Sequence, residues 1–197
     1  MTRPISGRLS LALVSCVFFM TFSIPAGTQE TGVKPEKPGE MQVIDGGFLA
    51  IDTPKGWVRS EGPGLLFFLK ESAERDSADV WIYVSGDSIG PDASARNLKD
   101  YIQSDIAGYR ARFKNGLVRE EAPMELPRVK LTAPVVTFES QEKHNSFEQV
   151  VYAGEQTRIL TFVLSAKTEE RFVETLPAFQ EFAKSYGGSI TLSPDTK

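Results

Sequence analysis

Apolar residues recur in this chain with two different sequence spacings, one typical of strands and one typical of helices. Together these spacings are compatible with few architectures. Strands are indicated by alternation, by β-branched and aromatic content or by a short apolar run in six segments: residues 47–53, 65–69, 80–84, 132–140, 147–153 and 158–165. Strands this close in sequence predict antiparallel neighbours, beginning with a hairpin that joins residues 47–53 to 65–69. Residues 117–126 could add an edge strand, although Pro123 and a high density of charge argue against it.

The spacing of apolar residues changes to a helical one in residues 94–113. Asp92 or Ser94 is the expected N-cap of this helix, because their short polar side chains can accept a backbone hydrogen bond. Steps of three and four place one apolar stripe on it: Leu98, Tyr101, Ile102, Ile106, Tyr109 and Phe113.

A second helix is expected to begin after Thr168, whose hydroxyl can cap it. Pro177 should kink this helix or split it, and Gly187 and Gly188 should end it. Its predicted apolar stripe has seven members: Phe172, Val173, Leu176, Phe179, Phe182, Ala183 and Tyr186.

The two helices have one apolar stripe each, whereas residues 65–69 (LLFFL) and 158–165 (RILTFVLS) are apolar on both sides of the strand. A sheet with two apolar faces must be covered on both of them. The sequence therefore predicts an α+β fold, an α/β/α sandwich in which a central, mainly antiparallel sheet is flanked by helices.

Residues 1–26 have the pattern of a secretory signal peptide. Arg3 and Arg8 precede an apolar run over residues 9–24, and small residues follow near Ala26. The chain is therefore expected to be exported to the periplasm or the extracellular space. Cys16 stands in a sequence (LVSC) like a bacterial lipobox, but the apolar run continues beyond it. Cleavage near Ala26 is therefore the favoured prediction.

The rest of the chain divides into a flexible linker (27–41) rich in Pro and Glu, a domain (42–188) and a C-terminal tail (189–197). Loss of Cys16 with the leader would leave no thiol for a disulfide or a metal site. Loss of Arg3 and Arg8 would leave 20 basic and 26 acidic side chains, a net charge of −6. An acidic surface of mixed sign argues against binding to nucleic acid or to anionic lipid.

Catalytic and metal-binding patterns are weak in this sequence. His144 is the single histidine and stands in a polar link, where a solvated loop is the expected setting. Two acidic clusters, at Glu71, Glu74, Asp76 and Asp79 and at Glu120 and Glu121, are expected to be solvated charge. A weak divalent-ion site at the first cluster and a hydrolase based on His144 stay open as alternatives. We expect a protein that is not an enzyme, with no cofactor and no metal.

Trp57 is the candidate binding residue. It follows Pro54 and Gly56, a proline that ends a strand and a glycine that permits a turn. A ring at the margin of a sheet can be half-buried and still offer an edge to a partner. Packing is the alternative, and it is the default for Trp57, Trp81, Tyr83 and Tyr152 alike.

The chain resembles the PsbP-like superfamily, which includes bacterial DcrB-like proteins and the extrinsic photosystem II subunit. The resemblance covers roughly residues 42–188 and rests on element order and on the segments GFLAIDTPKGW, ADVWIYVSG and FVETLPAFQEFAKSY. It implies an α/β/α sandwich around an antiparallel sheet, in proteins that are generally small binding or accessory proteins. No motif of the chain identifies binding residues that could be carried over from the family.

Two functions follow as hypotheses. The first is an exported, non-catalytic accessory protein that binds a protein partner in the cell envelope through the sheet margin or a helix face. The alternative is a small-ligand or lipid-binding protein with a pocket between sheet and helix. Association with a membrane is expected only if Cys16 is lipidated or the leader is not cleaved.

Overall fold

A computed structural model describes residues 41–44, 47–60, 66–70, 78–88, 98–142, 146–156 and 158–191. All of them belong to one compact unit that begins at Pro35. The predicted signal peptide, Cys16, the expected caps Asp92 and Ser94, and His144 lie outside the described residues, as do most of the linker and part of the tail.

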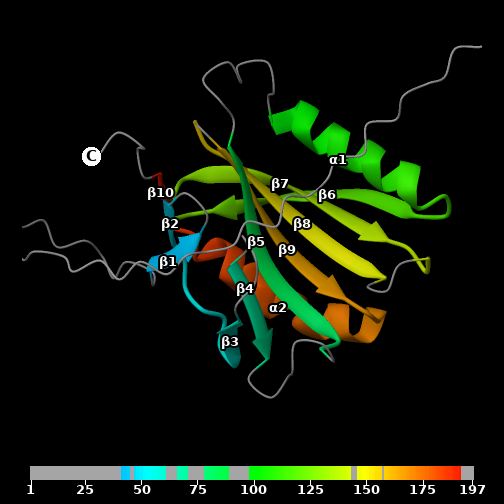
Figure 1. The fold of residues 1–197 in the computed structure, drawn as a ribbon, viewed down its shortest axis with the longest axis horizontal. Helices are drawn as coiled ribbons and strands as arrows, with labels where there is room; N and C mark the ends of the chain where they lie inside the picture. The colour runs from blue at the N-terminus through cyan, green and yellow to red at the C-terminus, as the bar shows by residue number, and fades with distance from the viewer. Residues whose placement is uncertain are drawn as a thin grey trace, which may run out of the picture. The chain divides into compact units, whose positions relative to one another are not determined.

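The main sheet has seven strands, and every neighbouring pair is antiparallel (Figure 1). Its order is β3-β4-β5-β9-β8-β7-β6. The strands are β3 (Trp57–Ser60), β4 (Leu66–Lys70), β5 (Val80–Ser88), β6 (Leu117–Leu126), β7 (Leu131–Glu139), β8 (Phe147–Gly154) and β9 (Arg158–Ala166). Two meanders, β3-β4-β5 and β6-β7-β8-β9, are joined by the pairing of β5 with β9.

A second, three-stranded sheet corrects the expected first hairpin. β2 (Gly47–Ala50) pairs with β1 (Met41–Ile44) and with β10 (Ser189–Thr191), and the hairpin partner of β4 is β3 instead. The reason is the turn between β2 and β3, where the Trp57 backbone N–H donates to the Pro54 carbonyl at 3.0 Å and Gly56 has φ +78°. This turn starts a new strand in another sheet.

The small sheet also shifts two expected boundaries. β1 begins at Met41, a residue of the predicted linker, and β10 lies within the predicted tail. Gly188, at φ +110°, turns the chain after the second helix so that Ala50 exchanges backbone hydrogen bonds with Gly187 and Gly188 at 2.7 and 3.0 Å. A glycine suits this turn because positive φ is costly for other residues.

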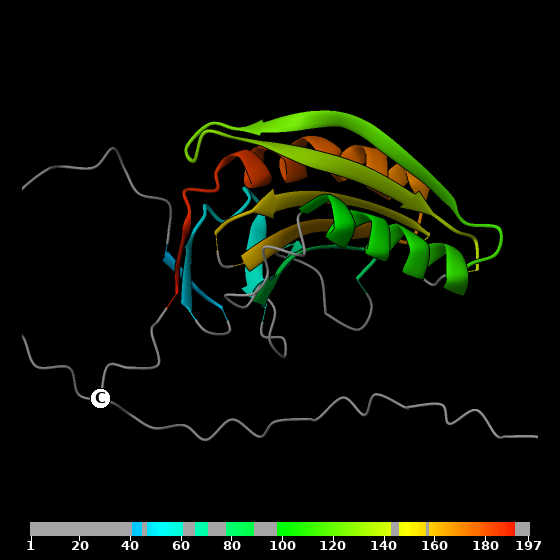
Figure 2. The ribbon, with the colours of Figure 1, turned by 90° about the horizontal axis from the view of Figure 1, so that it is seen from above.

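The part of the chain that the structure describes has two helices, α1 (Leu98–Arg112) and α2 (Glu169–Lys184), and they cover opposite faces of the main sheet (Figures 1 and 2). α2 packs on one face with the side chains of Val80, Ile82 and Val84. α1 packs on the other face, where Tyr83 points. An α+β fold with a mainly antiparallel sheet and two helices is thereby confirmed.

The start of α2 agrees with the prediction from the sequence, whereas its middle differs from that prediction. Thr168 is the N-cap, and its hydroxyl accepts a hydrogen bond from the Arg171 N–H at 3.3 Å. The helix is not split, because one continuous α-helix runs through Pro177. Phe172 before the proline and Phe179 after it are both buried on the sheet, which keeps the two halves in line. Val173, expected in the apolar stripe, is 59% exposed.

β6 confirms the possible edge strand in spite of Pro123. Its register against β7 shifts between Glu121 and Met124, which is a β-bulge of the kind that accommodates a proline on an edge strand. Alternation of the burial pattern is seen only after the bulge, where Met124 and Leu126 enter the core below α2.

Candidate ligand-binding site

Three central strands present polar and aromatic side chains on the face that α1 covers. Alternation along β5 places Tyr83 and Ser85 on this face. The register pairs Tyr83 with Val163 and Ser85 with Thr161 on β9, and β8 adds Tyr152 beside Thr161. Segments that are far apart in the sequence are therefore neighbours on one surface.

α1 supplies the opposite wall. Tyr101, Asp105, Tyr109 and Arg112 recur at steps of four, four and three, so they share one face of the helix. Gly154 at the end of β8 lets the helix come close, because a Cβ there would lie 3.3 Å from Leu98 Cδ2.

A cavity of about 280 Å³ lies between α1 and this surface. It is lined by residues from α1 and from strands β5, β7, β8 and β9: Tyr83, Ser85, Tyr101, Asp105, Tyr109, Arg112, Phe138, Glu148, Val150, Thr161 and Val163. We call it the α1 cavity. Most of the lining side chains carry a hydroxyl or a charge, so the cavity is polar although it lies beside an apolar core.

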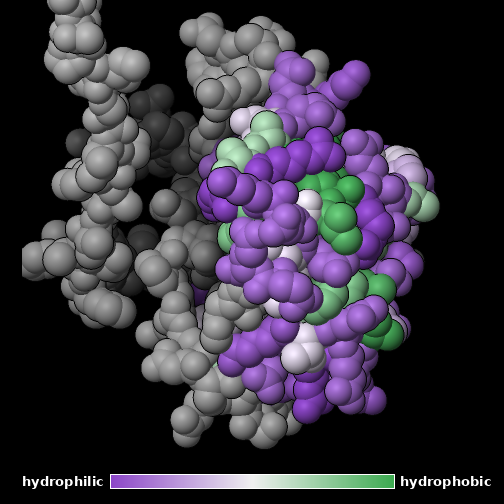
Figure 3. All heavy atoms as spheres, turned by 90° about the vertical axis from the view of Figure 1, so that its right-hand side faces the viewer, coloured by the Kyte–Doolittle hydropathy of each residue, from purple (hydrophilic) through white to green (hydrophobic). Residues whose placement is uncertain are grey.

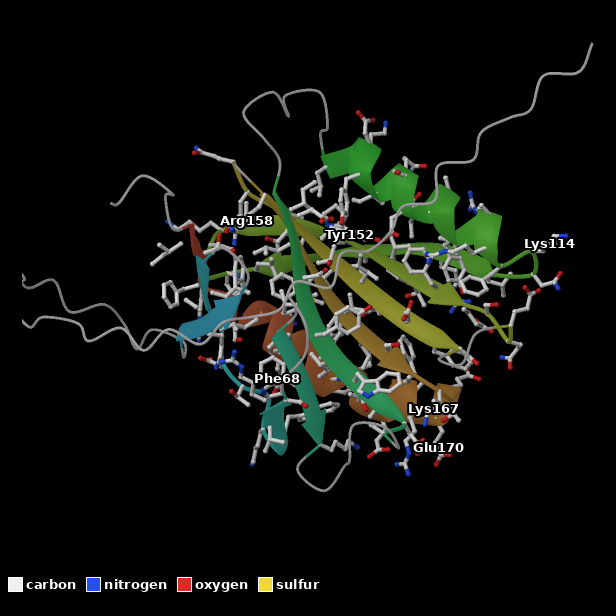
Figure 4. All side chains as sticks on the ribbon, viewed as in Figure 1. Phe68, Lys114, Tyr152, Arg158, Lys167 and Glu170 are labelled. Carbon is white, nitrogen blue, oxygen red and sulfur yellow. The ribbon has the colours of Figure 1, made fainter. Side chains whose placement is uncertain are left out.

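Hydroxyl groups and carboxylates are paired around the α1 cavity. Tyr152, which projects from β8 toward α1 (Figure 4), donates to Asp105 Oδ2 at 2.5 Å. Ser165 donates to Glu148 Oε1 at 2.9 Å, and the Tyr101 hydroxyl donates to Asp87. These bonds fix the orientation of the carboxylates.

The pKa values of the tyrosines indicate that the electrostatic potential in the cavity is negative. Burial raises the pKa of Tyr83, and the negative charges of Glu148 and Asp105 raise it further. Burial also raises the pKa of Tyr152, with the hydrogen bond to Asp105 as the next cause. Because both carboxylates act on the same Tyr83 hydroxyl, their negative potentials converge in the cavity.

Tyr109 is the one lining residue with a buried hydroxyl that lacks a hydrogen-bond partner in the described part of the chain. Its side chain is 3% exposed, and the ring packs on Phe138 with centroids 4.8 Å apart. Burial raises the pKa of this hydroxyl, and nearby Ser140 lowers it without reaching hydrogen-bond geometry. A buried hydroxyl normally has a partner, so this one is available to a ligand.

A separate groove of about 590 Å³ runs between α1 and the edge of the sheet. Leu98 and Ile102 of α1, Pro123 of β6, and Pro134 and Val136 of β7 give it an apolar floor, with Lys99, Gln103, Glu120 and Glu121 at its sides. We call it the β6 groove. It lies on a different face of α1 from the cavity.

Trp57, the predicted binding residue, is at the start of β3 with 5% of its surface exposed. It belongs to the apolar cluster on the α2 side of the sheet, so its placement favours the packing interpretation. A role of Trp57 in binding stays a prediction.

Of the two acidic clusters, Glu71, Glu74 and Asp76 lie outside the described residues. Asp79 forms an ion pair with Lys167 at 3.2 Å, and Glu120 and Glu121 are exposed on β6. No group of three or more His, Cys, Asp or Glu side chains that could hold a metal ion occurs among the residues that the structure describes.

Sequence reasoning missed Asp105, Glu148 and the role of Tyr101 and Tyr109. The sequence did contain a signal for the tyrosines, since they stand in place of aliphatic residues at two positions of the α1 stripe. A tyrosine hydroxyl in a core requires a hydrogen-bond partner. The carboxylates gave no signal, because an isolated Asp in a helix and an isolated Glu in a strand are ordinary surface residues.

Neither helix of the described part is long and apolar enough to span a bilayer. Neither a protein-family model nor a curated protein matches the chain.

Proposed function

We propose that this chain is an exported, non-catalytic binding protein of PsbP-like fold, and that it holds a small polar ligand in the α1 cavity. The observation that supports this most is the buried Tyr109 hydroxyl without a partner, beside two oriented carboxylates, in a cavity between helix and sheet. This is the second of the two functions that the sequence suggests. The polar lining favours a polar ligand over a lipid.

The chemistry of the lining favours binding over catalysis. The pKa of Tyr83, Tyr101, Tyr109 and Tyr152 is raised in each case, first by burial. These hydroxyls therefore stay protonated at neutral pH and act as hydrogen-bonding groups, whereas a catalytic base must lose its proton near the working pH.

The volume of the cavity limits the ligand. Pockets for drug-sized molecules measure roughly 300–1,000 Å³, and the α1 cavity, at about 280 Å³, falls just below that range. A ligand of a few heavy atoms, comparable to a small metabolite, fits this volume.

The test is a screen of small polar molecules against the purified chain, with binding followed by NMR. Ser85→Phe should fill the cavity and abolish the shifts of every cavity ligand. Ser60→Phe, the same change on edge strand β3, is the matched control and should leave them intact. A screen in which all hits survive Ser85→Phe would contradict the proposal.

A protein partner in the cell envelope is the second candidate, and the β6 groove supports it. The groove is apolar and adjoins β6, an edge strand of the sheet. The face in Figure 3 adds little support, since it shows only small hydrophobic areas among hydrophilic ones. Exposed patches that bind proteins are usually contiguous and apolar.

Photo-crosslinking in intact cells tests this second candidate. A crosslinking amino acid at Gln103 in the groove should capture a discrete partner, while the same amino acid at Ala111, exposed on another side of α1, should not. Equal products at both positions would count against a partner at the β6 groove.

A further inference from the structure

β6 is the last strand of the main sheet, and the strand order places no described strand beyond it. An edge strand directs the N–H and C=O groups of alternate residues away from its neighbour. The β-bulge between Glu121 and Met124 interrupts the register against β7. The regular part of this edge is therefore residues 117–121, and four of these five residues are exposed.

The β6 groove lies beside this edge, on the face of the sheet that α1 covers. Glu120 is opposite Val136 in the register, and Val136 belongs to the apolar cluster on the α1 side. Apolar side chains from β6, β7 and α1 line the groove: Pro123, Pro134, Val136, Leu98 and Ile102. A peptide that adds a strand to a sheet uses two features of this kind, the backbone groups of the edge for affinity and side-chain pockets for specificity.

Charges on β6 are compensated on one face of the strand and not on the other. Arg119 forms ion pairs with Glu139 at 3.2 Å and with Glu121 at 3.8 Å. Alternation along the strand places Glu120 on the opposite face, where it lines the groove. In the part of the chain that the structure describes, Glu120 forms no ion pair, and Lys99 on the α1 wall does not reach it. A carboxylate without a paired cation thus lies at the rim of the groove.

We propose that the β6 edge binds an extended segment of a partner protein as an added strand, with a basic side chain opposite Glu120 and apolar side chains two positions away on either side. This inference rests on the second candidate function, a protein partner at the β6 groove. One apolar side chain is then next to Val118, which packs on the α1-side cluster. The other is next to the groove at Pro123.

A second copy of this chain fits the edge less well than a basic segment. Antiparallel pairing of two β6 strands about a two-fold axis at Glu120 would pair Arg119 with Glu121 of the second copy. The same register would place the two Glu120 side chains directly opposite each other. Like charges at directly opposed positions destabilise a sheet, whereas opposite charges stabilise it.

Selection from a random heptapeptide library on phage, with the full chain as bait, tests the chemistry of the partner. Enriched peptides are expected to alternate apolar and polar residues around one Lys or Arg. Selection against Glu120→Lys should replace that basic residue by Asp or Glu. Glu125→Lys, an exposed change on β6 beyond the bulge, is the matched control and should leave the selected pattern unchanged. Failure to enrich any peptide, or the same pattern with Glu120→Lys, overturns the inference.

Hydrogen exchange followed by NMR locates the bound peptide. At saturation, an enriched peptide should slow the exchange of alternate amides within residues 117–121 by about tenfold or more, and it should leave β3, the opposite edge, unchanged. N-methylation of alternate peptide amides should abolish binding in one phase and spare it in the other, because only every second amide of an added strand pairs with the edge. Unchanged exchange in residues 117–121, or equal loss of binding in both phases, overturns strand addition.

The outcomes separate this inference from the partner site on which it rests. If Gln103 crosslinks to a discrete partner and the enriched peptides leave residues 117–121 unprotected, the partner site stands and the added strand is wrong. If Gln103 captures nothing in cells and the enriched peptides protect residues 117–121, the strand site stands and the partner in the cell envelope is wrong.

Discussion

All five tyrosines of this chain have a raised pKa, and burial is the first cause in each. Four of them lie on the α1 side of the sheet. The fifth, Tyr186, is on the α2 side and donates its hydroxyl to Glu155, which also accepts from Ser189 of β10. At the scale of the residue, tyrosines therefore pack between the helices and the main sheet, and several of their hydroxyls donate hydrogen bonds to carboxylates.

Tyrosine ionisation should therefore be linked to unfolding. The unfolded pKa is near 10.0 and the folded values are higher, so protonation stabilises the folded state. This stabilisation is fully present below pH about 10 and is lost as the pH rises toward the folded pKa. Absorbance titration should show phenolate forming well above pH 10 in the native protein, together with the loss of ellipticity. In urea it should form near pH 10.

A native titration with most of the tyrosines ionising reversibly near pH 10 would contradict this. Tyr101→Phe is a suitable check, because it removes one phenol and should reduce the amplitude of the alkaline absorbance change.

Trp57→Ala should destabilise the fold by about 3 kcal/mol, since a buried tryptophan is exchanged for a cavity. Urea unfolding measures this, and Val58→Ala is the neighbouring control because Val58 is 42% exposed on the same strand. A loss no larger than that of the control would show that the Trp57 ring is not part of the core.

At the scale of the element, tertiary packing determines the structure where the local sequence both favours and disfavours a helix. Pro177 disfavours a helix interior by removing one hydrogen bond, yet α2 is continuous through it. Phe182, five residues later, packs against Phe68 of β4 with ring centroids 5.1 Å apart. Phe172, before the proline, packs against Phe147 of β8 with ring centroids 6.1 Å apart. These aromatic contacts on both sides of the proline outweigh the lost bond.

The N-terminus of α2 offers a direct test of local capping. Thr168→Ala removes the acceptor of the Arg171 N–H and should cost about 1 kcal/mol of stability. Thr168→Ser keeps the hydroxyl and should cost much less. Thermal and urea unfolding of the pair measures the difference, and equal stability of the two variants would show that the cap contributes nothing.

At the scale of the whole molecule, the pairing of β5 with β9 holds the main sheet together. It joins residues 80–88 to residues 158–166 in an unbroken register of nine pairs. Both strands are internal to the sheet and both of their faces are covered in part by a helix. Among the strands that the structure describes, the outer ones, β3 and β6, have a neighbour on one side only.

The rate of amide hydrogen exchange should depend on whether a strand is internal or at the edge of the main sheet. Amides of β9 and β8 should exchange slowest, because they open only on global unfolding, whereas amides on the free side of β6 before its bulge should exchange through local opening. Exchange detected residue by residue by NMR measures this. Protection in residues 117–121 equal to that in β9 would indicate that another strand covers this edge.

The period of the apolar residues, which depends on positions two to four apart, was enough to predict most strands of the main sheet, both helices and the two faces of β5, and the hydroxyl of Thr168 was enough to predict the cap of α2. It could not predict that β2 and β10 form a separate sheet, because strand pairing depends on residues about 140 positions apart. The α1 cavity was unpredictable for the same reason. Asp105, Glu148 and Thr161 are ordinary residues of three different elements, and only the tertiary register brings their polar groups to one buried place.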